Sequence, residues 1–413
     1  MTRRPPSAAP DRAAARPAGR TPRHRAPDRP AAGRAAAPTM PRPRLLLLAG
    51  GGVGLLLGTW TGLSRAGVHD PIAPMAAHGI LMVLGFLGTL IALERAVAFG
   101  ARWAFAGPAL SALAVLTIAA DLPDAVAGVL LTAAGLVVTA VYATTLARRV
   151  EPHLALMAAG AVAWVVAAAL WAVGWSPVAL APTLAAFLVL TIVGERLELS
   201  RLRVSSAASR RRLLAAAALF GSGVALTLIQ RPAGLVVAGV GLVAQTAWLA
   251  RHDIARVTIH RAGLPRFAAA CMLAGYLWLA VGGVLWIVLG AGVGGLVHDA
   301  ALHAVFLGFV ISMVMGHAPI ILPAVLRTPL PYRPSAWVPL VLLHASVALR
   351  VAADLADSVW LRGWAAHGNV TALLLFAALA VVTARRAGRS YQADAPQPVR
   401  PAAPAPREQR SLT

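Results

Sequence analysis

The stretch "APMAAHGILMVLGFLGTLIALER", from Ala73 to Arg95, is apolar over a length that can cross a membrane. A helix of about 20 apolar residues spans the hydrocarbon core of a bilayer. This stretch carries His78 near its beginning and the pair Glu94-Arg95 at its end. Lipid offers an imidazole no hydrogen-bonding partner, so we expect His78 to face another helix or a bound ligand.

Runs of the same kind recur along the chain and decide the fold class. Hydrophobic residues make up 59% of the 413 residues and charged residues only 13%, which no ordinary soluble domain matches. The sequence therefore predicts an all-α, polytopic membrane bundle of about twelve transmembrane helices. The expected spans are residues 45–63, 72–97, 103–120, 124–147, 153–175, 180–198, 212–230, 233–250, 266–290, 295–326, 335–355 and 364–384.

The strongly basic charge has a topological explanation. The net charge of +22 comes from arginine, since the chain has no lysine. The arginines lie in the two tails and at alternate ends of the expected spans, as the positive-inside rule requires of cytoplasmic loops. We therefore expect a lipid bilayer as the partner, the bacterial inner (cytoplasmic) membrane as the location, and both termini in the cytoplasm. This placement of the arginines also excludes nucleic-acid binding as the explanation of the positive charge.

Composition also predicts three regions. Residues 1–41 are rich in Arg, Pro and Ala without apolar periodicity, which is typical of a disordered cytoplasmic tail. Residues 42–387 form the expected membrane domain, and residues 388–413 a second disordered cytoplasmic tail. Met40 is an alternative to Met1 as the start of translation. The single Cys271 excludes a disulfide framework within the chain and a CxxC metal site.

Two histidines are expected at the same depth on different spans. His78 lies about 10 Å below the outer end of the second span, and His303 about 12 Å below the outer end of the tenth, at roughly 1.5 Å per residue. Two imidazoles so placed could ligate a planar metal centre, and a b-type haem with two histidine ligands is the leading hypothesis. Their alternative role is a hydrogen bond to a neighbouring helix.

Other residues extend this candidate site. Arg350 and Arg362, with Arg65, are outer-side cations that could pair with haem propionates. His317 and His344 are further candidate metal ligands, and His317 could instead serve a proton route or stabilise a kink near Pro319.

The pairs Glu94-Arg95 and Glu195-Arg196 close the second and sixth spans. We interpret them as self-neutralising anchors at the cytoplasmic surface, with a proton entrance as the alternative.

Two segments carry a family resemblance. "AAHGILMVLGFLGTLI" and "LHAVFLGFVISMVMGHAPIILPAV" resemble the NnrS-like membrane proteins and, more remotely, subunit I of the haem–copper oxidases and nitric oxide reductases. The resemblance covers about two spans. It implies a twelve-span fold, arranged in three arcs of four in the oxidases, together with haem, a possible role for copper and a link to nitric oxide response.

The oxidase resemblance also implies haem ligands on spans two and ten, which correspond to His78 and His303. In that family spans six and seven supply copper ligands, but the corresponding segments here contain no histidine. This departure argues against oxygen or nitric oxide reduction at a binuclear centre.

The functional prediction is an integral membrane haem- or metal-binding protein with a redox or nitric-oxide-response role. The alternatives are a secondary transporter of a small solute and a membrane scaffold or assembly factor without a cofactor. No catalytic residue is predicted, and the sequence leaves open whether any reaction is catalysed.

Overall fold

The computed structural model describes residues 42–70, 73–200, 206–292, 296–327 and 330–393. Every regular element in these ranges is a helix, which confirms the predicted all-α fold. The tail predicted at 1–41 lies outside the described residues. The last helix, α15 (Val359–Ala393), continues beyond the boundary predicted at 387, and the remainder of the second tail also lies outside the described residues.

Eleven helical segments in these ranges are long and apolar enough to cross a membrane, so the chain is a multi-pass membrane protein. They follow the expected spans within a few residues. The segments are Pro43–Arg65, Met75–Phe99, Arg102–Ala119, Asp124–Arg148, Pro152–Ala172, Pro177–Leu199, Arg231–His252, Leu264–Gly290, Val297–Val325, Pro334–Leu355 and Val359–Ala387.

The remaining expected span, 212–230, corresponds to α8 (Ala207–Thr227). This helix begins with Ser206, whose hydroxyl accepts a hydrogen bond from the Ser209 N–H, and it packs along α9 (Arg231–His252). Its first turns carry the arginines 210–212, which shorten its apolar stretch. It is therefore a helix of the bundle that lacks the apolar length of the other eleven. The three-arc arrangement stays a prediction.

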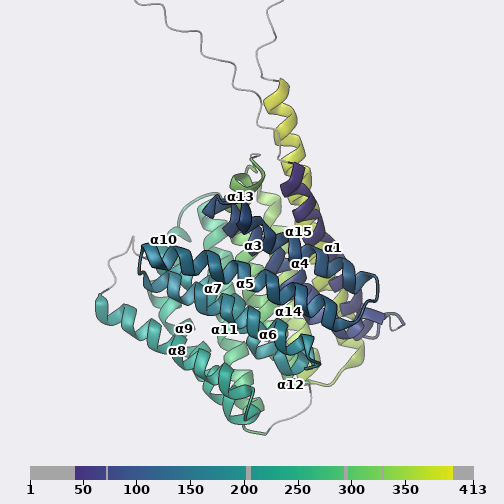
Figure 1. Cartoon of the computed structure of the whole chain (residues 1–413), viewed down its shortest axis with the longest axis vertical. Coiled ribbons are helices and arrows are strands. Elements are labelled where there is room, and N and C mark those ends of the chain that lie inside the picture. Colours follow the sequence, from purple (N-terminus) through teal and green to yellow (C-terminus); the bar gives the residue numbers. More distant parts are fainter. Residues whose placement is uncertain (1–41, 71–72, 201–205, 293–295, 328–329, 394–413) are drawn as a thin grey trace, which may run out of the picture. The chain divides into compact units, whose positions relative to one another are not determined.

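Seven further long helices belong to the described bundle, and Figure 1 labels them with their neighbours. Short helical turns η1 (Ala73–Ala77), η3 (Arg102–Phe105), α10 (Ala255–Thr258) and η6 (Pro334–Ala336) join some of the long helices. The long helices in chain order, apart from those already given, are α1 (Arg42–Arg65), α4 (Ala106–Ala119), α5 (Asp124–Arg148), α6 (Pro152–Ala172), α7 (Pro177–Leu199), α11 (Leu264–Gly290) and α14 (Trp337–Leu355).

The two histidine-bearing spans share an irregularity. The second span consists of α2 (His78–Ile80), the π-helix η2 (Leu81–Gly88) and α3 (Thr89–Phe99). The tenth consists of α12 (Val297–His303), the π-helix η5 (Ala304–Ile311) and α13 (Ser312–Leu326). Each π-helix contains the tripeptide Leu-Gly-Phe at the same place. A π-helical turn is rare in proteins overall, and those that occur are often found at functional sites. The two π-helices therefore indicate that both spans contribute to a functional site.

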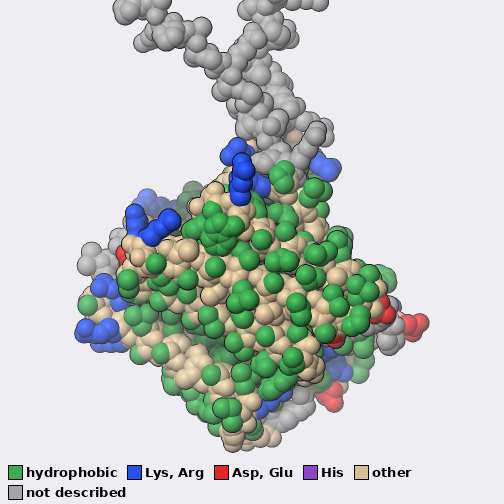
Figure 2. Space-filling model, in the orientation of Figure 1, with side chains coloured by type: hydrophobic (Ala, Val, Ile, Leu, Met, Phe, Trp, Pro, Cys, Tyr) green, Lys and Arg blue, Asp and Glu red, His purple; other side chains and the backbone are tan. Residues whose placement is uncertain are grey.

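Helix α7 lies at the centre of the bundle. In its most apolar stretch 83% of the residues are buried, the largest share of any spanning segment. Apolar side chains cover the middle of the face seen in Figure 2, whereas most arginines on that face lie toward α10 and α13. One end of α7 borders a cavity and the other end a buried network of polar groups.

Candidate functional site

A cavity lies where the second and tenth spans approach the beginning of α7. Its walls come from α1, α2, η2, α7, α12, η5, α14 and α15. It measures about 160 Å³, and one buried water needs roughly 10–15 Å³ on the same measure. The cavity therefore has room for a ligand of many atoms. Its polar lining residues are Thr59, Arg65, His78, Asp299, His303, Arg350 and Asn369.

His78 is fixed by the first span and presents one ring nitrogen to this cavity. Its Nδ1 lies 2.8 Å from the carbonyl oxygen of Gly58, so the Nδ1–H donates to that oxygen. The ring packs against Gly62, where an added Cβ would lie 2.8 Å from the ring Cε1. Its Nε2 has no hydrogen-bond partner among the described residues. His78 therefore carries a free acceptor in the cavity wall.

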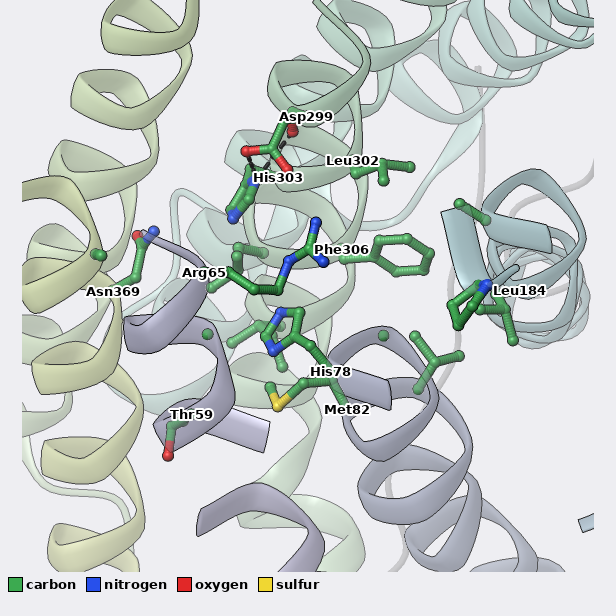
Figure 3. A pocket seen from close by; sticks show the side chains of 18 of the residues that line it. Thr59, Arg65, His78, Met82, Leu184, Asp299, Leu302, His303, Phe306 and Asn369 are labelled. Carbon is green, nitrogen blue, oxygen red and sulfur yellow. Dashed lines mark hydrogen bonds and ion pairs between the residues drawn. The ribbon is translucent and has the colours of Figure 1, made fainter. Parts of the chain in front are cut away.

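His303 is held in the same manner. Its Nδ1 lies 2.8 Å from the carbonyl oxygen of Asp299, one turn earlier on α12, and the Asp299 carboxylate lies 3.4 Å away. No described residue bonds its Nε2. Metal-bound histidines almost always donate their second ring N–H to a carbonyl or carboxylate. The structure thus brings two such imidazoles, from two spans, to one cavity (Figure 3).

A charged cluster lies beside His303. Arg350 on α14 contacts the Asp299 carboxylate and also that of Asp354, whose Oδ2 lies 3.0 Å from the Arg350 Nε. Ligand atoms of Asp299, His303 and Asp354 lie within 4.8 Å of one another, so this group could hold a metal ion. The guanidinium of Arg350, however, already neutralises part of its negative charge.

The three arginines that were expected to pair with haem propionates have different surroundings. Arg65, at the end of α1, lines the cavity and has no ion-pair partner among the described residues. Figure 3 shows its guanidinium between the two imidazole rings in that view, so a planar ligand there requires this exposed side chain to turn aside. Arg350 lines the cavity but pairs with two carboxylates. Arg362 pairs with exposed Asp357 at 3.8 Å and does not line the cavity.

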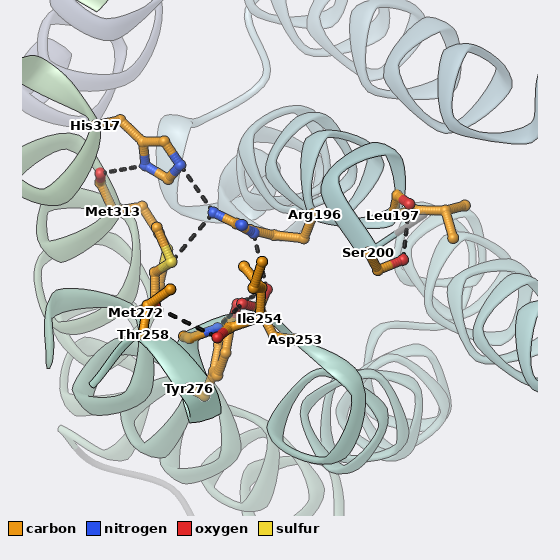
Figure 4. A network of polar contacts seen from close by, with 11 residues as sticks. Arg196, Leu197, Ser200, Asp253, Ile254, Thr258, Met272, Tyr276, Met313 and His317 are labelled. Atoms are coloured by element: carbon orange, nitrogen blue, oxygen red, sulfur yellow. Dashed lines mark hydrogen bonds and ion pairs between the residues drawn. The ribbon is translucent and has the colours of Figure 1, made fainter. Parts of the chain in front are cut away.

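His317 belongs to a separate network at the other end of α7 (Figure 4). Its Nδ1–H donates to the Met313 carbonyl oxygen at 2.7 Å, and its Nε2 accepts from Arg196 Nη1 at 3.0 Å. The same Arg196 nitrogen lies 3.1 Å from the sulfur of Met272. Both nitrogens of His317 therefore have partners, and the residue does not line the cavity.

Arg196 itself corrects one expectation. The sequence predicted a surface anchor paired with Glu195, but Arg196 is only 1% exposed, and its Nε lies 2.8 Å from Asp253. Tyr276 donates a hydrogen bond to the same carboxylate at 2.7 Å. Arginine was expected to reach water, but Asp253 follows α9 directly and turns its carboxylate inward. The other pair, Glu94-Arg95, does form an ion pair.

His344 also lies outside the cavity. Its Nδ1 accepts from the indole N–H of Trp278 at 3.0 Å, which leaves Nε2–H to donate to the hydroxyl of Ser312 at 3.3 Å. Both ring nitrogens are engaged, so the structure gives His344 the geometry of a helix-to-helix link. Of the four histidines predicted as metal ligands, only His78 and His303 share one space.

Sequence reasoning missed two cavity residues. Asp299 was not among the predicted site residues, although its four-residue spacing to His303 places both on one face of a helix. Asn369 is buried, lines the cavity and accepts a hydrogen bond from Ser346 through its Oδ1. No local pattern singles out Asn369, because its importance comes from the packing of α15 against the other helices.

Comparison with known proteins gives a family but no activity. No curated protein and no solved structure matches this chain. The model of the family described as "Domain of unknown function (DUF8744)" matches residues 44–385, which cover the spanning segments described above, apart from the outermost residues of the first and last, and both cavity histidines. The chain therefore belongs to the DUF8744 family.

Proposed function

We propose that this protein is a membrane redox protein that binds a b-type haem between His78 and His303. The observation that carries the proposal is the pair of imidazoles on one cavity, each with its Nδ1–H donated to a backbone carbonyl and its Nε2 without a hydrogen-bond partner in the described part of the chain. Neutral imidazole oriented in this way is a common axial ligand of haem iron. The resemblance to NnrS-like proteins adds nitric oxide response as the setting of this role.

The rest of the cavity supports the same ligand. Its deep walls are apolar, formed by residues such as Leu87, Leu184 and Phe306, and suit a porphyrin ring. An added Cβ at Gly79 would meet no atom within 4 Å, so the wall is open beside His78. Arg65 supplies the free cation for a carboxylate arm.

A haem in this position would supply a reversible one-electron change at its iron. His78 and His303, from two different spans, would hold and orient the group, and the apolar wall would exclude water around it. The chemistry that it would supply there is electron transfer or storage. Thr59 has its hydroxyl bonded to the Leu56 carbonyl oxygen at 2.9 Å and contributes to the wall.

The test is the optical spectrum of the full chain, purified in detergent from haem-supplemented cells. We expect a b-type reduced-minus-oxidised difference spectrum and haem in near-equal amount to protein. His78→Ala and His303→Ala should each lose it. His367→Ala is the matched control, because His367 is exposed on α15 and outside the cavity. A colourless wild-type protein, or unchanged spectra in both cavity variants, overturns the proposal.

A single metal ion, with copper among those to be assayed, is the second candidate, favoured by the Asp299, His303 and Asp354 group. Elemental analysis of the same preparations separates the two. An ion in that group should survive His78→Ala, since His78 is not a member, and should be lost in Asp354→Asn. Haem should be lost in His78→Ala and retained in Asp354→Asn.

A further inference from the structure

Asp299, Arg350 and Asp354 form a charged cluster beside His303, in which Arg350 and Asp354 are buried and Asp299 is half-buried. Asp354 is 3% exposed, and its Oδ1 has no hydrogen-bond partner in the described part of the chain. Burying a carboxylate is expensive unless it is paired and hydrogen-bonded. The buried carboxylate of Asp354, only partly compensated, therefore calls for a functional explanation.

The charges of the cluster do not cancel. Two carboxylates share one guanidinium, because Arg350 contacts both Asp299 and Asp354, so the three side chains carry one net negative charge. If Arg350 paired with Asp299 alone, that carboxylate would be neutralised. Asp354 competes for the same cation and leaves excess negative charge next to the ring of His303.

That excess charge faces the N–H of the imidazole. The Asp299 Oδ2 lies 3.4 Å from His303 Nδ1, and the Asp299 backbone oxygen lies 2.8 Å from it. Both acceptors favour the tautomer with hydrogen on Nδ1 and leave the lone pair on Nε2 toward the cavity. Acceptors in this second layer fix the ring of a ligating histidine and make it more basic.

We infer that Asp299, Arg350 and Asp354 are positioning residues that orient His303 and strengthen its Nε2 as an electron donor. This inference rests on the proposed function, and it assigns these carboxylates to the tuning of that site instead of to a second metal ion. By contrast, within the described ranges His78 has no carboxylate partner and bonds only to the Gly58 carbonyl oxygen and, at 3.4 Å, to Thr61. The two ligands are thus unequal, and His303 is the stronger donor.

A direction for the redox potential follows. A more basic ligand and a nearby negative charge both stabilise oxidised over reduced iron, so the intact cluster lowers the midpoint potential. Asp299→Asn should raise it, and Asp354→Asn should raise it by a smaller amount, because Asp354 acts through Arg350. Arg350→Gln removes the positive charge and should lower it.

The experiment is a redox titration of the haem-loaded full chain, followed by its optical spectrum, with low-temperature electron paramagnetic resonance of the oxidised form as a second readout. Asp357→Asn is the matched control, because Asp357 is 85% exposed and pairs only with Arg362. Asp299→Glu, which keeps the charge, should restore a potential near that of the wild type. A cluster with only a structural role would lower the melting temperature without these opposite shifts.

The outcomes are distinct for the two proposals. Absence of haem from the wild-type protein overturns the proposed function, and the inference with it. Haem that is present, with the same potential in Asp299→Asn, Asp354→Asn and Arg350→Gln, overturns the inference alone. If Asp299→Asn does not retain haem, the midpoint potentials of Asp354→Asn and Arg350→Gln still test the inference, because they should shift in opposite directions.

Discussion

Helix α7 connects two polar regions that use similar residues in opposite ways. Near its beginning, Pro177 and Ala181 line the cavity that contains His78 and His303. Near its end, about 28 Å away at roughly 1.5 Å per residue, Arg196 meets His317 and Asp253. Both regions are buried among apolar helices, and both contain histidine, arginine and aspartate.

They differ in whether the hydrogen-bonding capacity is used. In the Arg196 network the carboxylate of Asp253 accepts from Tyr276 and from the Ala255 N–H, and His317 uses both ring nitrogens. In the cavity two imidazole nitrogens and one arginine have no partner among the described residues. In the Arg196 network the Nε of Arg196 makes an ion pair with Asp253 but no well-oriented hydrogen bond. A network in which nearly every polar group is paired rigidifies the protein, whereas unused donors and acceptors around a space indicate a ligand.

The largest effect should come from breaking the Arg196 network. Arg196→Ala removes one partner of a buried ion pair and leaves Asp253 as an uncompensated charge, at a cost of about 3–5 kcal/mol in unfolding free energy. Chemical unfolding of detergent-solubilised protein measures it. Arg196→Met combined with Asp253→Asn should recover part of the loss, because no buried charge then remains. Equal stability of Arg196→Ala and wild type would contradict the structural role of this network.

A smaller effect should distinguish the two kinds of histidine. His317→Ala removes an acceptor from buried Arg196, so we expect the free energy of unfolding of the ligand-free protein to fall by about 1–3 kcal/mol. His78→Ala opens an existing cavity further and removes one backbone hydrogen bond, which should cost about 0.5–1.5 kcal/mol. In haem-supplemented preparations the order should reverse, since His317→Ala keeps the stabilisation that bound haem gives and His78→Ala, which loses haem, does not. If His317→Ala were the less stable variant with and without haem supplementation, the distinction between a structural and a ligand-binding histidine would be wrong.

The smallest effects concern the two glycines next to His78. Gly62→Ala places a Cβ 2.8 Å from the ring Cε1 and must displace the imidazole, so haem content should fall while the fold persists. Gly79→Ala adds its methyl group to open space and should change unfolding free energy by less than about 0.5 kcal/mol. Haem content by absorbance compares the pair. Equal content in both variants would mean that the position of His78 is not critical.

The two cavity histidines were predicted from their depth in the membrane alone. His78 and His303 were paired because counting residues along a helix gives position across a membrane with little ambiguity. The same counting could not tell which way His317 faces, because the π-helix η5 alters the rotation of the residues that follow it on the tenth span relative to a regular α-helix. It also could not tell which helix His344 faces, because the neighbours of α14 are set by tertiary packing. Arg362 was chosen for its side of the membrane, although its actual neighbour is Asp357.

The sequence by itself determined the all-helical membrane fold, nearly all its spans and the two histidines of the cavity, because apolar length and periodic spacing are local properties. Only the tertiary structure decided which polar groups keep a partner. Three results depend on helices far apart in the chain: Arg350 is shared by two carboxylates, Arg65 meets none among the residues that the structure describes, and Arg196 is buried with Asp253. Burial makes each unmet hydrogen bond costly, so these long-range pairings separate the ligand site from the structural core.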